Sequence, residues 1–360
     1  MSRYRTLSAL LLVAVAAGGA RAQECPPAQL VTSVDMKIGD DGRIYVPVKV
    51  RDENRSLLVD TGGFWSELTK QTAEGLRLST HHIRYELIGV GGDTTSMTTT
   101  TSLLLGNLRA DAADFMVIPD ADGFATDVPN VAGLLAPNLL HDYDVDIDFS
   151  TMKLSLYSQN HCEGKAVNWP GGIAVLPMQL DSNDHIQIPV QLDGHNLTAI
   201  LDTGATRSVL DVELAKSTFG LTPGDADTQE VGRLMRSPQS KTYSHRFKSL
   251  ALGGIAIADP AVRLIPDLMR NKIKDPHANL EGGTRLPRVI EKPGFGDMIL
   301  GMNVIREWHV YIAYKEQKLY LTRSPVVLSV ESTNPIDQTA AIRGQATPNP
   351  PPAARLRPHS

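Results

Sequence analysis

Short apolar runs alternate with polar positions along most of the chain and are separated by Gly, Pro and Asp. Runs of this kind, bounded by turn residues, are typical of β-strands. Helical periodicity is confined to short stretches such as residues 69–76 and 212–219. The pattern therefore predicts a mainly β protein with few helices.

The same pattern occurs twice. One copy starts at Gly42 and reads GRIYVPVKVRDENRSLLVDTGG, and the other starts at His185 and reads HIQIPVQLDGHNLTAILDTGA. Each copy reads as strand, turn and strand, followed by Asp-Thr-Gly, and the two triplets are 142 positions apart (202 − 60). An internal repeat over such an interval indicates two homologous units.

The end of each copy also repeats. Residues 131–157 and 298–321 both contain an apolar run closed by glycine, then a short helical pattern, then two strands. We therefore expect an N-terminal lobe over residues 23–158 and a C-terminal lobe over residues 173–323, joined by a polar linker, 159–172. The segment from Asp267 to Phe295 lies outside the repeat and is longer than an ordinary connection, which suggests a functional or mobile insertion.

Both ends of the chain differ from the repeat. Residues 1–22 have the pattern of a secretory signal, with Arg3 and Arg5 before an apolar stretch and a small-residue cleavage site. We therefore expect a secreted or periplasmic protein, with an uncleaved N-terminal anchor as the alternative. No later stretch is apolar enough to predict a membrane span. Residues 324–360 are rich in proline and are expected to form a disordered tail.

Charge and cysteine content narrow the choice of partners. The net charge is −5 (35 − 40), and removing the signal with its three arginines makes it −8 (32 − 40). An acidic protein is a poor candidate for binding nucleic acid. The two cysteines, Cys25 and Cys162, are too few for a zinc cage or a disulfide-built scaffold. They are expected to form one disulfide, with two unpaired thiols as the alternative.

The triplets carry the candidate chemistry. A single Asp-Thr-Gly would be read as a turn, but two in the same frame of a repeat call for another explanation. Two lobes related by a pseudo-twofold axis can bring Asp60 and Asp202 face to face. Two carboxylates that face each other at such short range cannot both ionise easily, so they share a proton. One can then act as a base toward water and the other as an acid toward a peptide carbonyl. This chemistry needs no metal and no cofactor.

The companions of each aspartate have expected roles in the geometry. Thr61 and Thr203 can form hydrogen bonds between the lobes. Gly62 and Gly204 have no Cβ and so allow the two loops to approach each other closely.

The motifs LLVDTGG and AILDTGA, each with a later AGLL or ILGM element, resemble those of a two-lobed aspartic protease of bacterial type with retropepsin-like lobes. The resemblance extends from about Arg43 to Arg323. It implies a bilobal acid-protease fold, in which two β-barrel-like lobes hold the active site between them. It also implies hydrolysis of peptide bonds by Asp60 and Asp202. Pepsin-type enzymes usually carry a hydroxyl residue after the triplet, where this chain has Gly63 and Ala205.

The family also closes a β-hairpin flap over its substrate. The candidate here is the segment from Tyr85 to Met97, in which Gly89, Gly91 and Gly92 would form the tip. A plain hairpin is the alternative. No HExxH metal motif and no Gly-x-Ser-x-Gly motif occurs in the sequence.

The sequence thus predicts a monomeric aspartic endopeptidase acting on peptides or proteins. A peptide-binding protein that keeps the cleft but has weak or no turnover is the alternative. A single active lobe that works by dimerisation is disfavoured, because both triplets lie in one chain.

Overall fold

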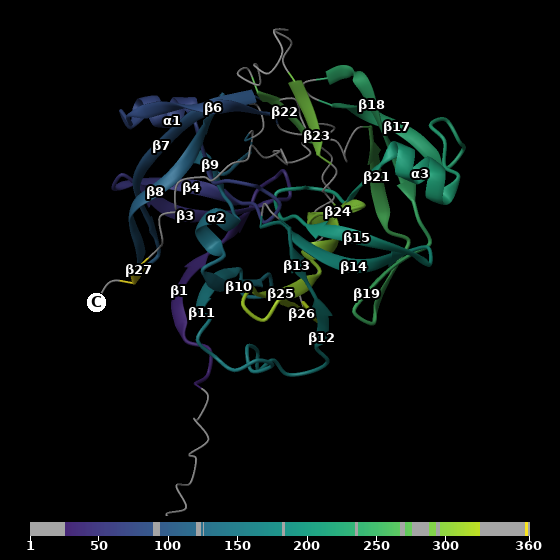
Figure 1. The fold of residues 1–360 in the computed structure, drawn as a ribbon. Coiled ribbons are helices and arrows are strands. Elements are labelled where there is room, and N and C mark those ends of the chain that lie inside the picture. Colours follow the sequence, from purple (N-terminus) through teal and green to yellow (C-terminus); the bar gives the residue numbers. More distant parts are fainter. Residues whose placement is uncertain are drawn as a thin grey trace, which may run out of the picture.

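The computed structural model describes residues 26–88, 94–119, 124, 126–181, 184–234, 237–266, 271–275, 288–292, 296–324 and 357–358. The expected signal segment, Cys25 and the expected flap tip (Gly89, Gly91 and Gly92) lie outside the described residues. The described part is mainly β and bilobal, as predicted (Figure 1).

The first lobe is a curved sheet that closes on itself, because β3 pairs with both β4 and β7. Its strands, in spatial order, are β2 (Lys37–Ile38), β3 (Ile44–Val50), β4 (Glu53–Val59), β9 (Val131–Leu135), β5 (Glu67–Thr69), β8 (Leu108–Ile118), β7 (Thr94–Leu105) and β6 (Thr80–Ile88).

The second lobe repeats this arrangement with shorter outer strands. In spatial order they are β17 (Thr228–Leu234), β18 (Ser237–Arg246), β21 (Ala261–Ile265), β16 (Val209–Asp211), β24 (Met298–Leu300), β15 (His195–Leu201), β14 (Ile186–Leu192), β19 (Ser249–Leu252) and β20 (Ile255–Ala258), and β13 (Gln179–Leu180) also pairs with β14.

Strand directions around the two triplets are the same in both lobes. In the first lobe β9 runs parallel to β4 and antiparallel to β5. In the second lobe β24 runs parallel to β15 and antiparallel to β16. The strand before each triplet, β4 or β15, is therefore hydrogen-bonded to a neighbour on both sides. This pairing fixes the backbone of the aspartate that follows the strand.

A third sheet joins the lobes and contains strands from both. Its order over the described residues is β1 (Leu30–Asp35), β11 (Lys153–Ser158), β10 (Tyr143–Asp148), β25 (Trp308–Ala313), β26 (Lys318–Arg323) and β12 (Ala174–Pro177). The central pair is antiparallel, with Val145 opposite Ile312 and Ile147 opposite Val310. The pseudo-twofold axis therefore passes between β10 and β25, at the bottom of the molecule in Figure 1.

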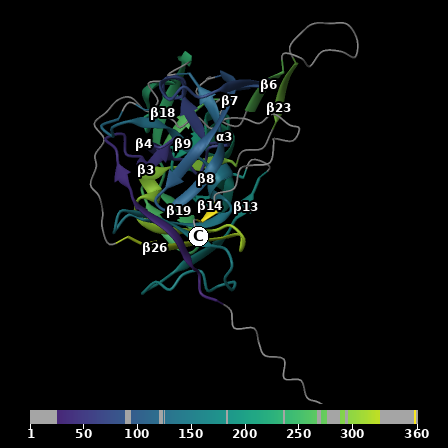
Figure 2. The same ribbon diagram turned by 90° about the vertical axis from the view of Figure 1, so that its left-hand side faces the viewer.

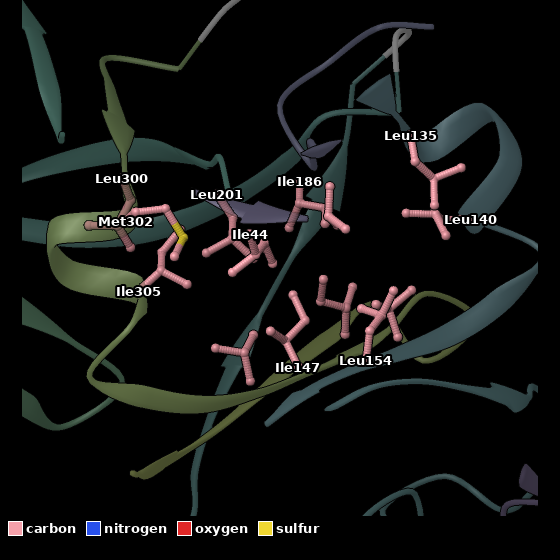
Figure 3. Close-up of a cluster of buried hydrophobic side chains, with 14 of the residues drawn as sticks. Ile44, Leu135, Leu140, Ile147, Leu154, Ile186, Leu201, Leu300, Met302 and Ile305 are labelled. Carbon is pink, nitrogen blue, oxygen red and sulfur yellow. The ribbon is translucent and has the colours of Figure 1, made fainter. Parts of the chain in front are cut away.

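The main core lies between this six-stranded sheet and the floors of both lobes. Figure 3 shows Ile147 and Leu154 of the sheet facing Ile44 and Leu135 of the first lobe and Leu201 of the second. All of these side chains are fully buried. Burying apolar side chains from both lobes in one core stabilises their relative position.

The helices are short, as predicted. They are α1 (Lys70–Gly75), α2 (Pro137–Leu140), α3 (Val212–Phe219) and α4 (Met302–Ile305). Thr69 caps α1 by accepting a hydrogen bond from the Thr72 N–H at 3.1 Å. Asp211 caps α3, which ends at Gly220 in the left-handed conformation. Side-chain caps and a C-terminal glycine are ordinary helix boundaries.

The insertion in the second lobe contributes strands to the sheet of the first lobe. β22 (Asn271–Asp275) and β23 (Arg288–Lys292) form a hairpin, and β22 pairs with β6 through Ile273 and Lys274. Both views place this hairpin at the top, beside β6 (Figures 1 and 2). The rest of the predicted tail lies outside the described residues beyond Ser324, except β27 (Arg357–Pro358), which pairs with β8.

Candidate active site

The two triplets meet between the lobes. Asp60 follows β4 and donates its N–H to the Leu135 carbonyl at 2.9 Å, and Asp202 follows β15 and donates to the Leu300 carbonyl at 3.0 Å. Both aspartates are fully buried. The parallel neighbours β9 and β24 thus fix the backbone at each aspartate in the same way.

Reciprocal threonine hydrogen bonds hold the triplets together. The Thr61 hydroxyl donates to the Leu201 carbonyl at 2.7 Å and accepts from the Thr203 N–H at 3.0 Å. The Thr203 hydroxyl donates to the Val59 carbonyl at 2.7 Å and accepts from the Thr61 N–H at 3.1 Å. These buried bonds cross the lobe interface in both directions and fix one triplet relative to the other.

Each triplet glycine lies against the carboxyl group of the opposite lobe. A Cβ on Gly62 would lie 2.6 Å from Oδ2 of Asp202, and a Cβ on Gly204 would lie 2.7 Å from Oδ2 of Asp60. Any side chain at either position would overlap a carboxyl group. The geometry thus places Asp60, Asp202 and their four expected companions in one cluster.

The carboxyl groups differ in their backbone hydrogen bonds. Oδ1 of Asp60 accepts one, from the Gly62 N–H at 3.0 Å. Oδ1 of Asp202 accepts two, from Gly204 at 2.8 Å and from Ala205 at 3.0 Å. Oδ2 of each carboxyl accepts no hydrogen bond from the described residues. These two oxygens are available to share a proton and to hold a water molecule.

Burial raises the pKa of both aspartates. For Asp60 the Asp202 carboxyl, the Gly62 N–H and the charges of Arg43 and His185 oppose the rise. Burial and the negative charge of Asp60 together raise the pKa of Asp202 well above its ordinary value. Raised pKa values on two adjacent carboxyl groups favour one shared proton, which is the arrangement of an acid beside a base.

A matched pair of polar contacts supports the two loops from behind. Oδ1 of Asn138 accepts from the Ser66 N–H at 2.7 Å and from its hydroxyl at 2.8 Å. Oδ1 of Asn303 accepts from the Ser208 N–H at 2.6 Å and from its hydroxyl at 3.0 Å. Ser66 and Ser208 are 142 positions apart (208 − 66), as the triplets are, but the sequence pattern did not predict that each serine bonds to an asparagine.

Gly133 and Gly301 lie where the rear strands pass the loops. A Cβ on Gly133 would lie 2.7 Å from the carbonyl carbon of Glu67, and one on Gly301 would lie 2.5 Å from that of Arg207. In both lobes a strand therefore passes close behind the loop, at the glycine that closes the repeated apolar run.

Arg43 is a buried residue near the site for which sequence reasoning assigned no role. It is 2% exposed and forms an ion pair with Asp41, with its Nη2 2.6 Å from Oδ2. The 142-residue offset of the repeat aligns Arg43 with His185. This match between two basic residues is the sequence signal that could have indicated a role for Arg43.

Other expected site features are not tested by the structure. Cys162 is disulfide-bonded, but the expected partner Cys25 lies outside the described residues, so the pairing stays a prediction. The flap tip also lies outside the described residues, so the flap stays a prediction. In the part of the chain that the structure describes, no group of acidic, histidine or cysteine side chains could hold a metal ion. Over the same residues, no helix is long and apolar enough to span a membrane.

Comparison with known proteins gives a family match for the second lobe. Residues 188–304 match the model of an aspartyl protease family. This match supports a protease-type function. The segment contains Asp202, Asn303 and most of the second-lobe sheet, and the family implies a peptide substrate.

Solved structures with similar folds include a basic 7S globulin from soybean and an aspartic proteinase from Irpex lacteus. The globulin is 10% identical with a TM-score of 0.45, covering 86% of this chain and all (100%) of its own. The proteinase is 14% identical with a TM-score of 0.44, covering 83% of this chain and 98% of its own. Neither likeness bears on activity. No curated protein matches the chain.

Proposed function

We propose that the protein is an aspartic endopeptidase of bacterial type with retropepsin-like lobes, which hydrolyses peptide bonds with a water held between Asp60 and Asp202. The observation that carries the proposal is the pairing of two buried carboxyl groups by reciprocal threonine hydrogen bonds. A protein that only binds peptides does not need two buried acids in contact, since each costs free energy to bury.

The reaction follows from one shared proton. The ionised carboxylate takes a proton from water, and the water oxygen adds to the peptide carbonyl carbon. The protonated carboxyl gives its proton to the carbonyl oxygen, which forms a tetrahedral diol. The carboxyl that took the water proton gives it to the nitrogen as the C–N bond breaks. A hydroxyl of the diol returns its proton to the other carboxylate as the new carboxyl product forms, so the dyad again holds a single proton.

We further propose that the protein is exported to the periplasm or secreted, and that it acts as a monomer. The pattern of residues 1–22 supports export. A single chain that supplies both triplets supports the monomer.

The test is digestion of an unfolded protein mixture by the purified chain across a pH series, with cleavage read by mass spectrometry. Asp60→Asn and Asp202→Asn should each reduce the rate by at least about 100-fold, because each acid–base step contributes about 10²–10⁴-fold. Asp111→Asn, at an exposed position on β8, is the matched control and should leave the rate unchanged.

An asparagine variant at either position with near-normal turnover would refute the dyad. If the wild-type chain binds unfolded peptides without cleaving them at any pH, the alternative of a binding protein replaces the enzyme.

A further inference from the structure

A buried cation lies across the strand pair from the first aspartate. In the β3–β4 pairing, Tyr45 is opposite Leu58. This is the last pair of the ladder, and Arg43 and Asp60 come two residues beyond it, just outside the two strands. The charge of the buried Arg43 acts on Asp60 there.

The second lobe has a basic residue at the equivalent place. Gln187 and Ile200 are the last pair of the β14–β15 ladder, and His185 and Asp202 come two residues beyond it. His185 is fully buried. Its Nδ1 is 2.9 Å from Oδ2 of Asp181, and its N–H donates to Oδ1 of the same residue at 3.1 Å. The pseudo-twofold symmetry of the site is therefore broken, with arginine on one side and histidine on the other.

Arg43 is held firmly in its position. Its Nε donates to Oδ2 of Asp41 at 2.7 Å, and the Tyr45 hydroxyl donates to the same oxygen at 2.5 Å. The second lobe also contacts this turn, since the Thr206 hydroxyl donates to the Asp41 carbonyl at 3.2 Å. Although burial opposes its charge, Tyr45, Asp41 and Asp60 together raise the pKa of Arg43. The guanidinium therefore remains a fixed cation.

We propose that Arg43 is a positioning residue that fixes the negative charge of the dyad on Asp60 and leaves the proton on Asp202. This inference rests on the proposed function and assigns its two roles: Asp60 is the base toward water and Asp202 is the acid toward the carbonyl. His185 does not do for Asp202 what Arg43 does for Asp60, because its charge also lowers the pKa of Asp60.

Backbone hydrogen bonds favour the opposite assignment, with the negative charge on Asp202. Asp202 accepts two N–H groups and Asp60 accepts one, which alone would favour the charge on Asp202. The Gly62 N–H lowers the pKa of Asp60 more than the charge of Arg43 does, but the charges of Arg43 and His185 both add to its effect. Asp202 is instead the carboxyl whose pKa is raised well above its ordinary value, by burial and by the charge of Asp60. The balance therefore favours the charge on Asp60.

The first test is the pH dependence of kcat/KM. Arg43→Gln removes the charge, and we expect the acid limb, which reports ionisation of the base, to move up by about one pH unit. Arg43→Lys keeps the charge and should keep the wild-type limb. Asp41→Asn/Arg43→Gln removes the whole ion pair and should still move the limb up. Arg109→Gln is the matched control, because Arg109 also pairs with an aspartate two residues away, but at an exposed position on β8.

A wild-type acid limb in the double variant would overturn the inference, because it would show that the ion pair is only structural. The second test needs no activity: ¹³C NMR titration of the aspartate carboxyl groups, assigned with Asp60→Asn and Asp202→Asn. In the wild type we expect Asp60 to ionise at lower pH than Asp202, and Arg43→Gln to narrow the gap.

The NMR result separates the two proposals. If Asp60 ionises first and Arg43→Gln narrows the gap but no peptide is cleaved at any pH, the charge assignment holds and the proposed function falls. If peptides are cleaved but Asp202 ionises first, the charge assignment falls and the function holds. If Arg43→Gln does not fold, an Asp202 that ionises first in the wild type still overturns the inference, and an Asp60 that ionises first in both the wild type and Arg43→Lys supports it.

Discussion

At the scale of single residues, the site differs from the pepsin-type pattern in the residue directly after each triplet. Gly63 lies close behind Asp60, where an added Cβ would be 3.1 Å from Oδ2 and 3.3 Å from the Ala136 side chain. Ala205 already has a Cβ, and its N–H donates to Asp202. Neither residue offers a hydroxyl to an ionised carboxylate. Position 205 is therefore the better place to test the effect of adding one.

Ala205→Ser should move the basic limb of the kcat/KM profile to lower pH. A hydroxyl that donates to the ionised dyad stabilises the charged form, so the pair loses its last proton at lower pH. The measurement is a pH–rate series on a peptide substrate, with Ala113→Ser in buried β8 as the control. An unmoved or raised limb would mean that burial, not hydrogen bonding, sets the upper pH limit.

At the scale of elements, the strands behind the triplets determine where the two loops lie. β24 passes so close to the loop after Asp202 that a Cβ on Gly301 would be 2.8 Å from the Ala205 carbonyl oxygen. The backbone atoms it would meet cannot move without displacing the loop. A change in the packing of β24 is therefore expected to move the loop that carries Asp202.

We expect Gly301→Ala to lower activity by at least about tenfold and to destabilise the fold by about 1–3 kcal/mol, the usual range for overpacking. Turnover and chemical denaturation measure the two effects. Gly172→Ala is the control, because an added Cβ there meets nothing within 4 Å. Normal turnover in Gly301→Ala would show that the loop tolerates movement of β24.

Much at the element scale could be predicted from the sequence, because it depends on local patterns. The strands flanking Asp60 and Asp202, the short helices and the two-lobed repeat are all encoded by periodicity and by turn residues. Pairings between distant segments left no such signal. The joining of β22 to β6 is one example, and the contact of Ser66 with Asn138 is another. Both depend on where separate elements meet in space.

At the scale of the whole molecule, buried acids make stability depend on pH. The folded-state pKa values of Asp60, Asp202 and Asp144 are all raised, chiefly by burial. The folded protein therefore holds these protons to higher pH than the unfolded chain. Their stabilising contribution is complete below the unfolded carboxyl value of about 3.9 and is lost as pH rises through the raised folded values.

We therefore expect the melting temperature to fall as pH rises above the mildly acidic range, and Asp202→Asn to reduce that fall. At pH 7 the variant should melt at least about 2 °C above the wild type, the shift that about 1 kcal/mol produces in a protein of this size. Calorimetry of both proteins between about pH 4 and 8 is the measurement. Equal slopes would show that the dyad does not contribute to the pH dependence.

The sheet shared by the two lobes has a consequence for how the chain acquires its structure. β10 has β25 as its neighbour, but β25 is synthesised only after more than 150 further residues. Until then the newly made first half presents an unpaired strand edge and an uncovered apolar face, which are features that promote aggregation. Because this contact joins residues so distant in the sequence, it also forms slowly. The first half thus depends on the second to complete this sheet.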